Sequence, residues 1–402
     1  MPKNPIIKGA KLVYRGSVKN VYELKPPTRK KSGVAVFEFT DDYSVFDYGK
    51  MPDQIDGKGQ SLALMTAAIF EQIENPKSWR ELYNLALWNA FDDSQFKGEM
   101  KNSRVFKNLK REGLKTHYLG MVSEAGEIKK LDAVKALTNM IAVKSVNVVA
   151  PVRRELLNIA LWDYFEVGNF SCRLVPLECV FRFGAPKGSS FFERAKDPAY
   201  LKLVGLSEEP KDGEWFSRPI VEFFTKLEPA DRFLDYGVAM NISGLGSRFS
   251  EIYEMTLLGA LWLKYIFAKA DIELWDGKFE FALIDDELVL VDAVTPDELR
   301  LTFEGVQMSK EPIRQYYKVN QPEFVGAMKE AKKISATDTR PLKKIVAELG
   351  HKPATLDIGF KDTVSYMYRA LAYQLAAPQG VFTCEQFDFA KIADTFRKFG
   401  VV

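Results

Sequence analysis

The chain has 402 residues, of which 47% are hydrophobic and 27% charged, and its formal net charge is +2. This composition is typical of a globular protein of about two or three domains, and the balanced charge argues against a nucleic-acid or membrane partner. The only histidines are His117 and His351, which excludes a mechanism built on several histidines.

The cysteines and the N-terminus indicate the compartment. Cys172, Cys179 and Cys384 are odd in number and lack the spacing of a zinc site, so neither a disulfide framework nor zinc is expected. The first residues have no apolar signal core, and no uninterrupted apolar run reaches the ~18 residues that a membrane span needs. We therefore expect a cytoplasmic protein.

The N-terminal part is predicted to be rich in β-strands. Residues 11–24, KLVYRGSVKNVYEL, break at Arg15-Gly16-Ser17, which predicts a glycine hairpin loop, and VAVFEF predicts the next strand. A helix is expected from about Ser61 to Glu74, where apolar residues recur at helical spacing. Residues 80–170 mix helical and strand patterns, and their order stays open.

Strand patterns return in the second half, at residues 172–183, CRLVPLECVFRF. A core helix is expected from about Ser250 to Ala270, because its apolar coverage is broad. A β-hairpin follows over residues 275–292, and residues 319–402 are expected to be mostly helical. The chain therefore predicts a mixed α and β fold.

The predicted hairpin carries charge where a sheet could use apolar residues. Over residues 278–283, Lys278 and Glu280 lie on one face and apolar residues on the other. A three-residue loop at 285–287 would place Glu280 directly opposite Asp292, whereas a two-residue turn would put the two acids on opposite faces. Facing carboxylates suit Mg²⁺, and Lys278 would then meet a phosphate. The alternative is a solvated charged face.

Further charged residues lie in the segment VPLECVFRFGAPKGSS and in the segments TPDELR and SKEPIRQYYK. Glu178 and Arg182 share a face if their segment is a strand, and Ser189 offers a hydroxyl suited to a phosphate monoester. An internal Arg–Glu ion pair is the alternative. Together with Arg182, Arg300 and Arg314 would form an anion pocket, because guanidinium groups match phosphate geometry.

Two more segments carry candidate residues. In RGSVKNVY, Gly16 would allow the backbone to approach phosphates and Lys19 would meet them, although a plain hairpin turn explains the same residues. In TKLEPADR, Lys226, Glu228 and Asp231 follow an apolar run. Surface solvation explains each of these singly, but their combination calls for a ligand.

In chain order, these segments resemble the SAICAR synthetase (phosphoribosylaminoimidazole-succinocarboxamide synthase) family. The eight matching segments are RGSVKNVY, DDYSVFD, IDGKG, VPLECVFR, TKLE, GKFEFAL, DAVTPDELR and KEPIR. They follow the family's order over about residues 11–70 and 172–318, which is about half of the chain.

The resemblance implies an ATP-dependent ligase of purine biosynthesis. Such an enzyme joins the carboxylate of carboxyaminoimidazole ribonucleotide to the amine of L-aspartate and releases ADP and phosphate. The implied fold is α+β and two-lobed, with ATP in the cleft. The lobes would be residues 1–173, antiparallel and β-rich with an insertion at about 80–165, and residues 174–318, with a helical extension over 319–402. The resemblance also allows a homo-oligomer.

The resemblance also assigns residues by position. Lys278, Glu280 and Asp292 would be catalytic, with Glu280 and Asp292 holding Mg²⁺. ATP would meet Gly16, Lys19, Lys278 and the backbone near Arg173 and Val175. The substrate-binding residues would be Glu178, Arg182, Ser189, Lys226, Glu228, Asp276, Arg300 and Arg314.

Several positions depart from the family pattern. Ser17 stands where the glycine loop usually has a second lysine, Ala293 replaces an acid, and Leu299 replaces a serine. The usual His-Asp pair after T-K-x-E is Asp231-Arg232, which leaves aspartate recognition open. Two alternatives therefore remain: a related ligase that uses another amine, or a nucleotide-binding regulator without turnover.

Overall fold

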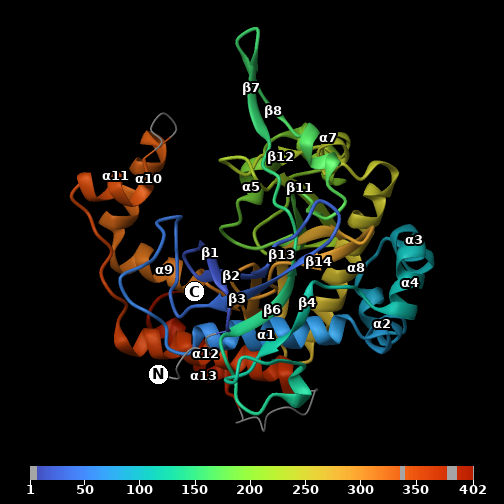
Figure 1. Ribbon diagram of the computed structural model, residues 1–402. Coiled ribbons are helices and arrows are strands. Elements are labelled where there is room, and N and C mark those ends of the chain that lie inside the picture. The colour runs from blue at the N-terminus through green and yellow to red at the C-terminus, as the bar shows by residue number, and fades with distance from the viewer. Residues whose placement is uncertain (1–6, 336–339, 378–386, 402) are drawn as a thin grey trace.

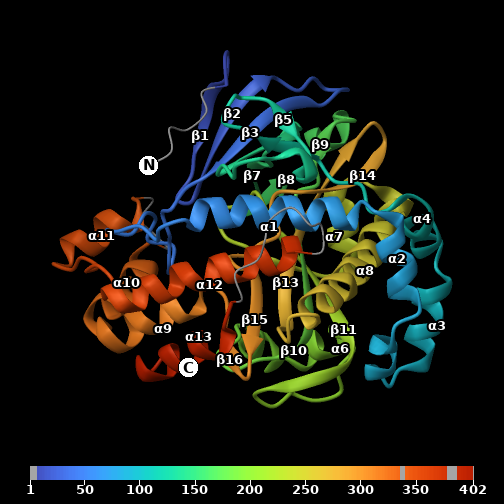
Figure 2. The ribbon, with the colours of Figure 1, turned by 90° about the horizontal axis from the view of Figure 1, so that it is seen from below.

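The structure, a computed structural model, describes residues 7–335, 340–377 and 387–401. Within these ranges the chain forms two antiparallel sheets, a separate two-stranded hairpin and a set of helices (Figures 1 and 2). The predicted α+β fold is confirmed. Among the described residues, no helix combines the length and apolar content that crossing a membrane requires.

The N-terminal sheet has six strands and begins with the predicted glycine hairpin. Its spatial order is β1 (Lys11–Arg15), β2 (Lys19–Lys25), β3 (Gly33–Phe39), β6 (Met140–Ser145), β4 (Tyr118–Val122) and β5 (Ile128–Lys129). In the β1–β2 turn, the Gly16 N–H donates to the Lys19 carbonyl at 2.9 Å. A Cβ at Gly16 would lie 2.6 Å from that oxygen, so the turn requires glycine.

The second sheet has eight strands, with the long β13 (Glu273–Ile284) at its centre. The order is β12 (Phe233–Leu234), β11 (Glu214–Thr225), β10 (Leu177–Ala185), β13, β15 (Leu299–Phe303) and β16 (Val306–Gln307); β14 (Glu287–Val291) and β9 (Arg173–Leu174) also pair with β13. The register sets Arg182 opposite Asp276, and Asp276 opposite Arg300. Three charged residues from three strands therefore form one row.

Helices cover both sheets. They are α1 (Lys58–Ile73), α2 (Pro76–Tyr83), α3 (Ser94–Asn102), α4 (Arg104–Glu112), α5 (Phe191–Ala195), α6 (Pro198–Val204), α7 (Tyr236–Ser243), α8 (Phe249–Ala268), α9 (Glu311–Asn320), α10 (Pro322–Ile334), α11 (Leu342–Glu348), α12 (Ile358–Ala376) and α13 (Phe389–Lys398). The helices predicted near 61–74 and 250–270 are α1 and α8, each beginning slightly earlier than expected.

The C-terminal extension is helical over its described part, as predicted, and packs against the start of the chain. Figure 2 shows α1 between the N-terminal sheet and α12. The Ser365 hydroxyl donates to the Asp56 carbonyl at 2.6 Å, and the Gln72 amide donates to the Leu375 carbonyl at 2.8 Å. The extension therefore shares the hydrophobic core with the N-terminal part.

Two features complete the fold. Strands β7 (Val152–Leu156) and β8 (Ile159–Asp163) form a hairpin that projects from the body (Figure 1). Cys172 and Cys179 are buried free thiols, whereas Cys384 lies outside the described residues.

Candidate functional site

The β13–β14 hairpin has a two-residue turn, so the three-residue loop considered from the sequence is wrong. Ile284 pairs with Glu287, and the turn residues Asp285 and Asp286 have φ angles of 51° and 63°. Aspartate tolerates the left-handed conformation that a two-residue hairpin turn requires. Glu280 is consequently paired with Val291, not with Asp292.

The Asp292 carboxylate nevertheless lies near that of Glu280, because Asp292 follows the last residue of β14 and no longer has strand geometry. Its φ angle is 67°, which breaks the alternation of side chains along the strand. A hydrogen bond of 3.0 Å joins its backbone oxygen to Nε2 of the buried His117. Its carboxylate pairs with Lys19 of β2. The left-handed residue therefore links the two sheets.

Around these acids lies a lysine–carboxylate cluster of six residues: Lys19, Lys226, Lys278, Glu178, Glu280 and Asp292. Lys226 Nζ is 2.6 Å from Glu280 and 3.1 Å from Glu178. Lys278 Nζ is 2.5 Å from Glu178 and 3.6 Å from Glu280. All six are residues that the sequence singled out, and they come from both sheets.

The electrostatics of the cluster distinguish its two central acids. Burial alone would raise the pKa of Asp292, but the ammonium groups of Lys19, Lys226 and Lys278 together lower that pKa to about 2. The pKa of Glu280 is raised, by burial and then by the Asp292 carboxylate, against the opposing effect of Lys226. The carboxylates of Glu280 and Asp292 thus repel each other, and a bound cation would reduce that repulsion.

The arginine row of the second sheet forms a further network. Arg182 Nη1 is 2.8 Å and Arg300 Nη1 is 3.2 Å from Asp276. Arg182 also pairs with the buried Glu222, which was not predicted. The alternative of an internal Arg–Glu ion pair thus applies to Arg182, with Glu222 in place of Glu178 as the partner.

Glu222 has two more partners that sequence reasoning missed. Arg194 Nη2 lies 2.9 Å from its carboxylate, and the Tyr200 hydroxyl donates to it at 2.6 Å. The available signal was the single acid in the apolar run PIVEFF, since a buried carboxylate needs a cationic partner.

Three predicted substrate residues make contacts outside these two networks. Ser189 is buried, and its hydroxyl accepts from the Phe191 N–H at 3.3 Å. Arg314 donates to Glu311 of its own helix at 3.0 Å. Glu228 accepts from the Tyr164 hydroxyl at 2.8 Å and from the Arg232 guanidinium at 2.7 Å.

The segment expected near adenine is tightly held. The Arg173 guanidinium donates to the carbonyls of Phe170 and Gly244 at 2.7 and 2.9 Å, so this side chain ties loops together. The Val175 N–H donates to the Phe281 carbonyl at 2.9 Å, next to the charged stretch of β13.

A third charged group forms where the motifs IDGKG and TPDELR meet the C-terminal extension. The buried Lys58 ammonium is 2.8 Å from Asp297, and the Tyr368 hydroxyl of α12 donates to Asp297 at 2.6 Å. Burial, followed by the Asp297 carboxylate, raises the pKa of Glu298 to about 7. Burial also lowers the pKa of the neighbouring Lys310.

The carboxylates fit a magnesium ion that also binds phosphate. Within the described ranges, no group of three or more His, Cys, Asp or Glu residues is placed to hold a metal. Mg²⁺, however, commonly takes one or two carboxylates together with substrate phosphates. Glu280 and Asp292 meet that lower requirement, and their mutual repulsion favours such an ion.

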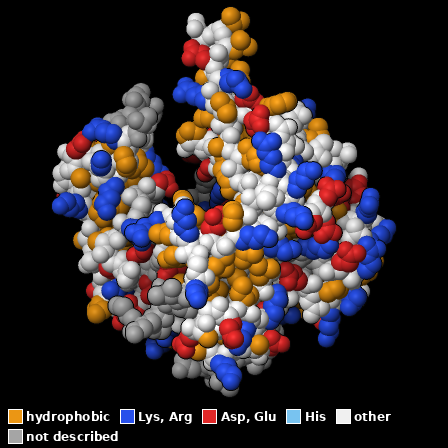
Figure 3. Space-filling model, in the orientation of Figure 1, with side chains coloured by type: hydrophobic (Ala, Val, Ile, Leu, Met, Phe, Trp, Pro, Cys, Tyr) orange, Lys and Arg blue, Asp and Glu red, His pale blue; other side chains and the backbone are white. Residues whose placement is uncertain are grey.

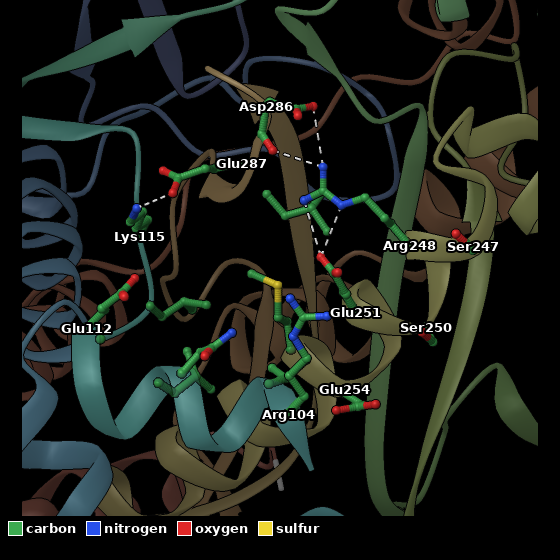
Figure 4. Close-up of a pocket in the computed structure, with 17 residues that line it drawn as sticks. Arg104, Glu112, Lys115, Ser247, Arg248, Ser250, Glu251, Glu254, Asp286 and Glu287 are labelled. Atoms are coloured by element: carbon green, nitrogen blue, oxygen red, sulfur yellow. Dashed lines mark hydrogen bonds and ion pairs between the residues drawn. The ribbon is translucent and has the colours of Figure 1, made fainter.

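A cavity of about 700 Å³ lies elsewhere, between α4, the start of α8 and the tip of the β13–β14 hairpin. Figure 4 shows that Arg248 contacts Asp286 and Glu251 there, and that Lys115 contacts Glu287. None of the six cluster residues lines this cavity. The candidate site is therefore identified by the lysine–carboxylate cluster, not by this cavity.

Comparisons with known proteins agree with the motifs. The SAICAR synthetase family matches residues 12–331. A putative phosphoribosylaminoimidazole-succinocarboxamide synthase of Archaeoglobus fulgidus is 36% identical over 309 residues, 75% of this chain and 79% of that protein. The synthase of Thermoplasma volcanium is 27% identical over 320 residues, 77% of this chain and 83% of that protein.

A solved structure supports the fold. The SAICAR synthase of Saccharomyces cerevisiae, in complex with SAICAR, has a TM-score of 0.54 and 19% identity, covering 93% of this chain and 97% of that chain. Since the family match spans most of the chain and a relative is 36% identical over three quarters of it, the chain belongs to the SAICAR synthetase family.

Proposed function

We propose that the chain is an ATP-dependent ligase. It joins the carboxylate of carboxyaminoimidazole ribonucleotide to the amine of L-aspartate and yields SAICAR, ADP and phosphate. The observation that carries this proposal is the lysine–carboxylate cluster, in a chain that belongs to the SAICAR synthetase family. Three lysines and three carboxylates, paired and within electrostatic reach of one another, provide the charge neutralisation that phosphoryl transfer demands.

The cluster residues have separate roles in this proposal. Glu280 and Asp292 hold Mg²⁺, which when bound neutralises phosphate charge. Lys19 and Lys278 meet the phosphates of ATP, and Gly16, Arg173 and Val175 contribute to the ATP site. Both lysines already contact carboxylates of the cluster, which holds their ammonium groups in position.

The reaction needs positioning more than proton transfer. The γ-phosphoryl group moves to the substrate carboxylate and gives an acyl phosphate. The aspartate amine then attacks the acyl carbon, phosphate leaves with the electron pair of the broken C–O bond, and the nitrogen releases a proton as the amide bond forms. Histidine is not required: burial lowers the pKa of His117 to about 4, so this residue is neutral at pH 7.

The arginine row is the proposed site for the nucleotide substrate. Arg182 and Arg300 share one carboxylate, Asp276, which orients both guanidinium groups. A guanidinium has five donors, so each keeps N–H groups for a phosphate. The other residues assigned to the substrate are Glu178, Ser189, Lys226, Glu228 and Arg314.

We also infer the lobe boundaries and the compartment. The lobes are residues 1–173, with an insertion at about 80–165, and residues 174–318, followed by an extension over 319–402. Two observations support this division: β1 to β6 form one sheet, and β9 to β16 form the other. The free thiols of Cys172 and Cys179 suit a reducing cytoplasm.

A second candidate is a related ligase that uses another amine. Arg232 donates to Glu228, and the pKa of the adjacent Asp231 is raised by burial and then by Glu178. Asp231-Arg232, in place of the family's usual His-Asp pair, thus lies within electrostatic reach of the cluster, where it would alter the choice of amine.

The test is ADP release from the purified chain with Mg-ATP and carboxyaminoimidazole ribonucleotide, with and without L-aspartate. Aspartate-dependent release together with SAICAR formation is the expected result. Release only with another amine would support the second candidate. ATP binding without release for any amine would show a nucleotide-binding regulator instead.

Asp292→Asn is the matched inactive variant for this assay. Asparagine tolerates the left-handed conformation of residue 292, so the fold should remain. Turnover should fall about 100-fold or more, because a charge that faces the phosphates is lost. Near-normal turnover of Asp292→Asn would contradict the metal assignment.

A further inference from the structure

The β7–β8 hairpin, residues 152–163, forms an arm. Its two strands pair with each other and, among the described residues, with no other strand. Figure 1 shows the arm projecting from the body, and Figure 3 shows hydrophobic side chains gathered at its tip. A two-stranded hairpin of this kind is only marginally stable in water by itself. We therefore expect a partner surface to cover the arm.

The tip of the arm exposes large apolar side chains. Leu157 is 87% exposed and Ile159 67% exposed, and Leu156 and Val152 are exposed as well. Leu157 also has a φ angle of 50° in a turn position where glycine or asparagine is usual. In the isolated chain this leucine contributes no hydrophobic stabilisation, because its side chain is exposed. Burial against a partner would remove its apolar surface from water.

The apolar residues gather on one face of the arm. Val152 lies opposite Asp163, Arg154 opposite Leu161, and Leu156 opposite Ile159. Cross-strand neighbours share a face, so this face holds four apolar side chains and one ion pair. The ion pair joins Arg154 to Asp163 at 2.5 Å, so neither charge on this face needs a partner from outside.

The free edge of β7 is complementary to itself. If two copies of VRREL run antiparallel with Arg154 of each at the centre, Val152 of one copy lies opposite Leu156 of the other, and Arg153 lies opposite Glu155. Each apolar residue then meets an apolar residue, and each remaining charge meets the opposite charge. Arg154 is already neutralised within its own chain.

We propose that the arm joins two copies of this chain by pairing β7 with β7 about a two-fold axis through Arg154. Such an axis makes each contact occur twice, which is the usual geometry of a homodimer. The same operation on β8 would centre on Leu161 and set Ile159 opposite the charged Asp163, so the β8 edge is not complementary to itself. The structure thus selects the β7 edge, and the strand-to-strand contact continues the arm into a four-stranded sheet.

Charge reversal tests this pairing. The mass of the full chain would be measured by light scattering after size exclusion, with sedimentation velocity over a range of concentrations. Wild type should be a dimer. Arg153→Glu and Glu155→Arg should each weaken dimerisation about tenfold or more, because two ion pairs become two repulsions. The double variant should restore the dimer, since residues 153 and 155 are again opposite in charge across the axis.

Further variants exclude loss of fold as the cause. Leu156→Asp should also weaken the dimer, with an unchanged circular dichroism spectrum, because the side chain is exposed in the single chain. Lys107→Glu is the control, since it makes the same charge change at an exposed position of α4. A monomeric wild type would overturn the proposal and leave the arm to an occupant of another kind. A dimer that is insensitive to all four arm variants would overturn it too.

Discussion

At the scale of single residues, buried charge is the main determinant of the site. Arg182 is 8% exposed at its side chain and bridges Glu222 and Asp276. Because this guanidinium is buried, it needs both carboxylate partners: an unpaired charge in the interior destabilises the folded state. The same arginine is therefore both a candidate ligand of the nucleotide substrate and part of the framework of the second sheet.

Arg182→Ala should lower the free energy of unfolding by about 3–5 kcal/mol, because it leaves two carboxylates without this partner. Urea denaturation measures the change. Arg111→Ala is the matched control: the Arg111 side chain is 69% exposed in its ion pair with Glu112, and loss of that pair should cost less than about 1 kcal/mol. An Arg182→Ala protein as stable as the control would contradict the framework role.

Glu298 makes stability depend on pH. Its pKa is raised from 4.5 to about 7, so the folded chain holds the proton more tightly than the unfolded chain. Its contribution to stability is complete below pH 4.5 and is lost as the pH rises through about 7. Glu298→Gln stays neutral and keeps an acceptor for the Thr295 hydroxyl.

The stability of Glu298→Gln relative to wild type should therefore increase between pH 4.5 and pH 7. Urea titrations at several pH values measure this difference. A difference that does not vary with pH would show that Glu298 titrates normally.

At the scale of elements, α12 joins the extension to the site. It lies along α1, and its Tyr368 hydroxyl reaches Asp297, the partner of Lys58. Burial, followed by Asp297, raises the pKa of Tyr368 well above its usual value, so the hydroxyl stays protonated and donates. The helix thus completes a buried network that begins in the IDGKG segment.

Tyr368→Phe should lower the free energy of unfolding by about 1.5–3 kcal/mol, because it removes a hydrogen bond to a charged group. Tyr236→Phe is the control, since Tyr236 is 46% exposed and should cost less than about 0.5 kcal/mol. Thermal or urea unfolding compares the two. Equal effects would mean that α12 contributes packing alone.

At the scale of the whole molecule, the site joins the two sheets. Lys19 comes from β2 of the N-terminal sheet, and Asp292 follows β14 of the other. A ligand that contacts both sheets stabilises the folded chain as a unit. Mg-ADP at about 100 times its Kd should add about 2.7 kcal/mol and raise the melting temperature.

Removal of the metal tests the proposed role of the carboxylates in the same measurement. EDTA should reduce the rise in melting temperature that ADP causes, and Asp292→Asn should show the reduced rise with or without EDTA. An ADP effect that is equal in wild type with and without Mg²⁺ would contradict a metal at Glu280 and Asp292.

The sequence alone determined the family and much of the secondary structure. The helical spacing of α1 and α8 and the alternation over residues 278–283 are local patterns, which a reader of the chain can follow residue by residue. The motif order supplied Lys19, Lys226, Lys278, Glu178, Glu280 and Asp292, and the structure brings all six together.

Only the tertiary structure decided which charges are partners. Arg182 pairs with Glu222 across adjacent strands, and Lys19 pairs with Asp292 across 273 residues of chain. The hairpin register and the left-handed Asp292 were likewise undetermined, because turn length depends on the backbone conformation of two or three residues. Long-range pairing follows from how strands are ordered in space, and a linear pattern of residue types carries no information about that order.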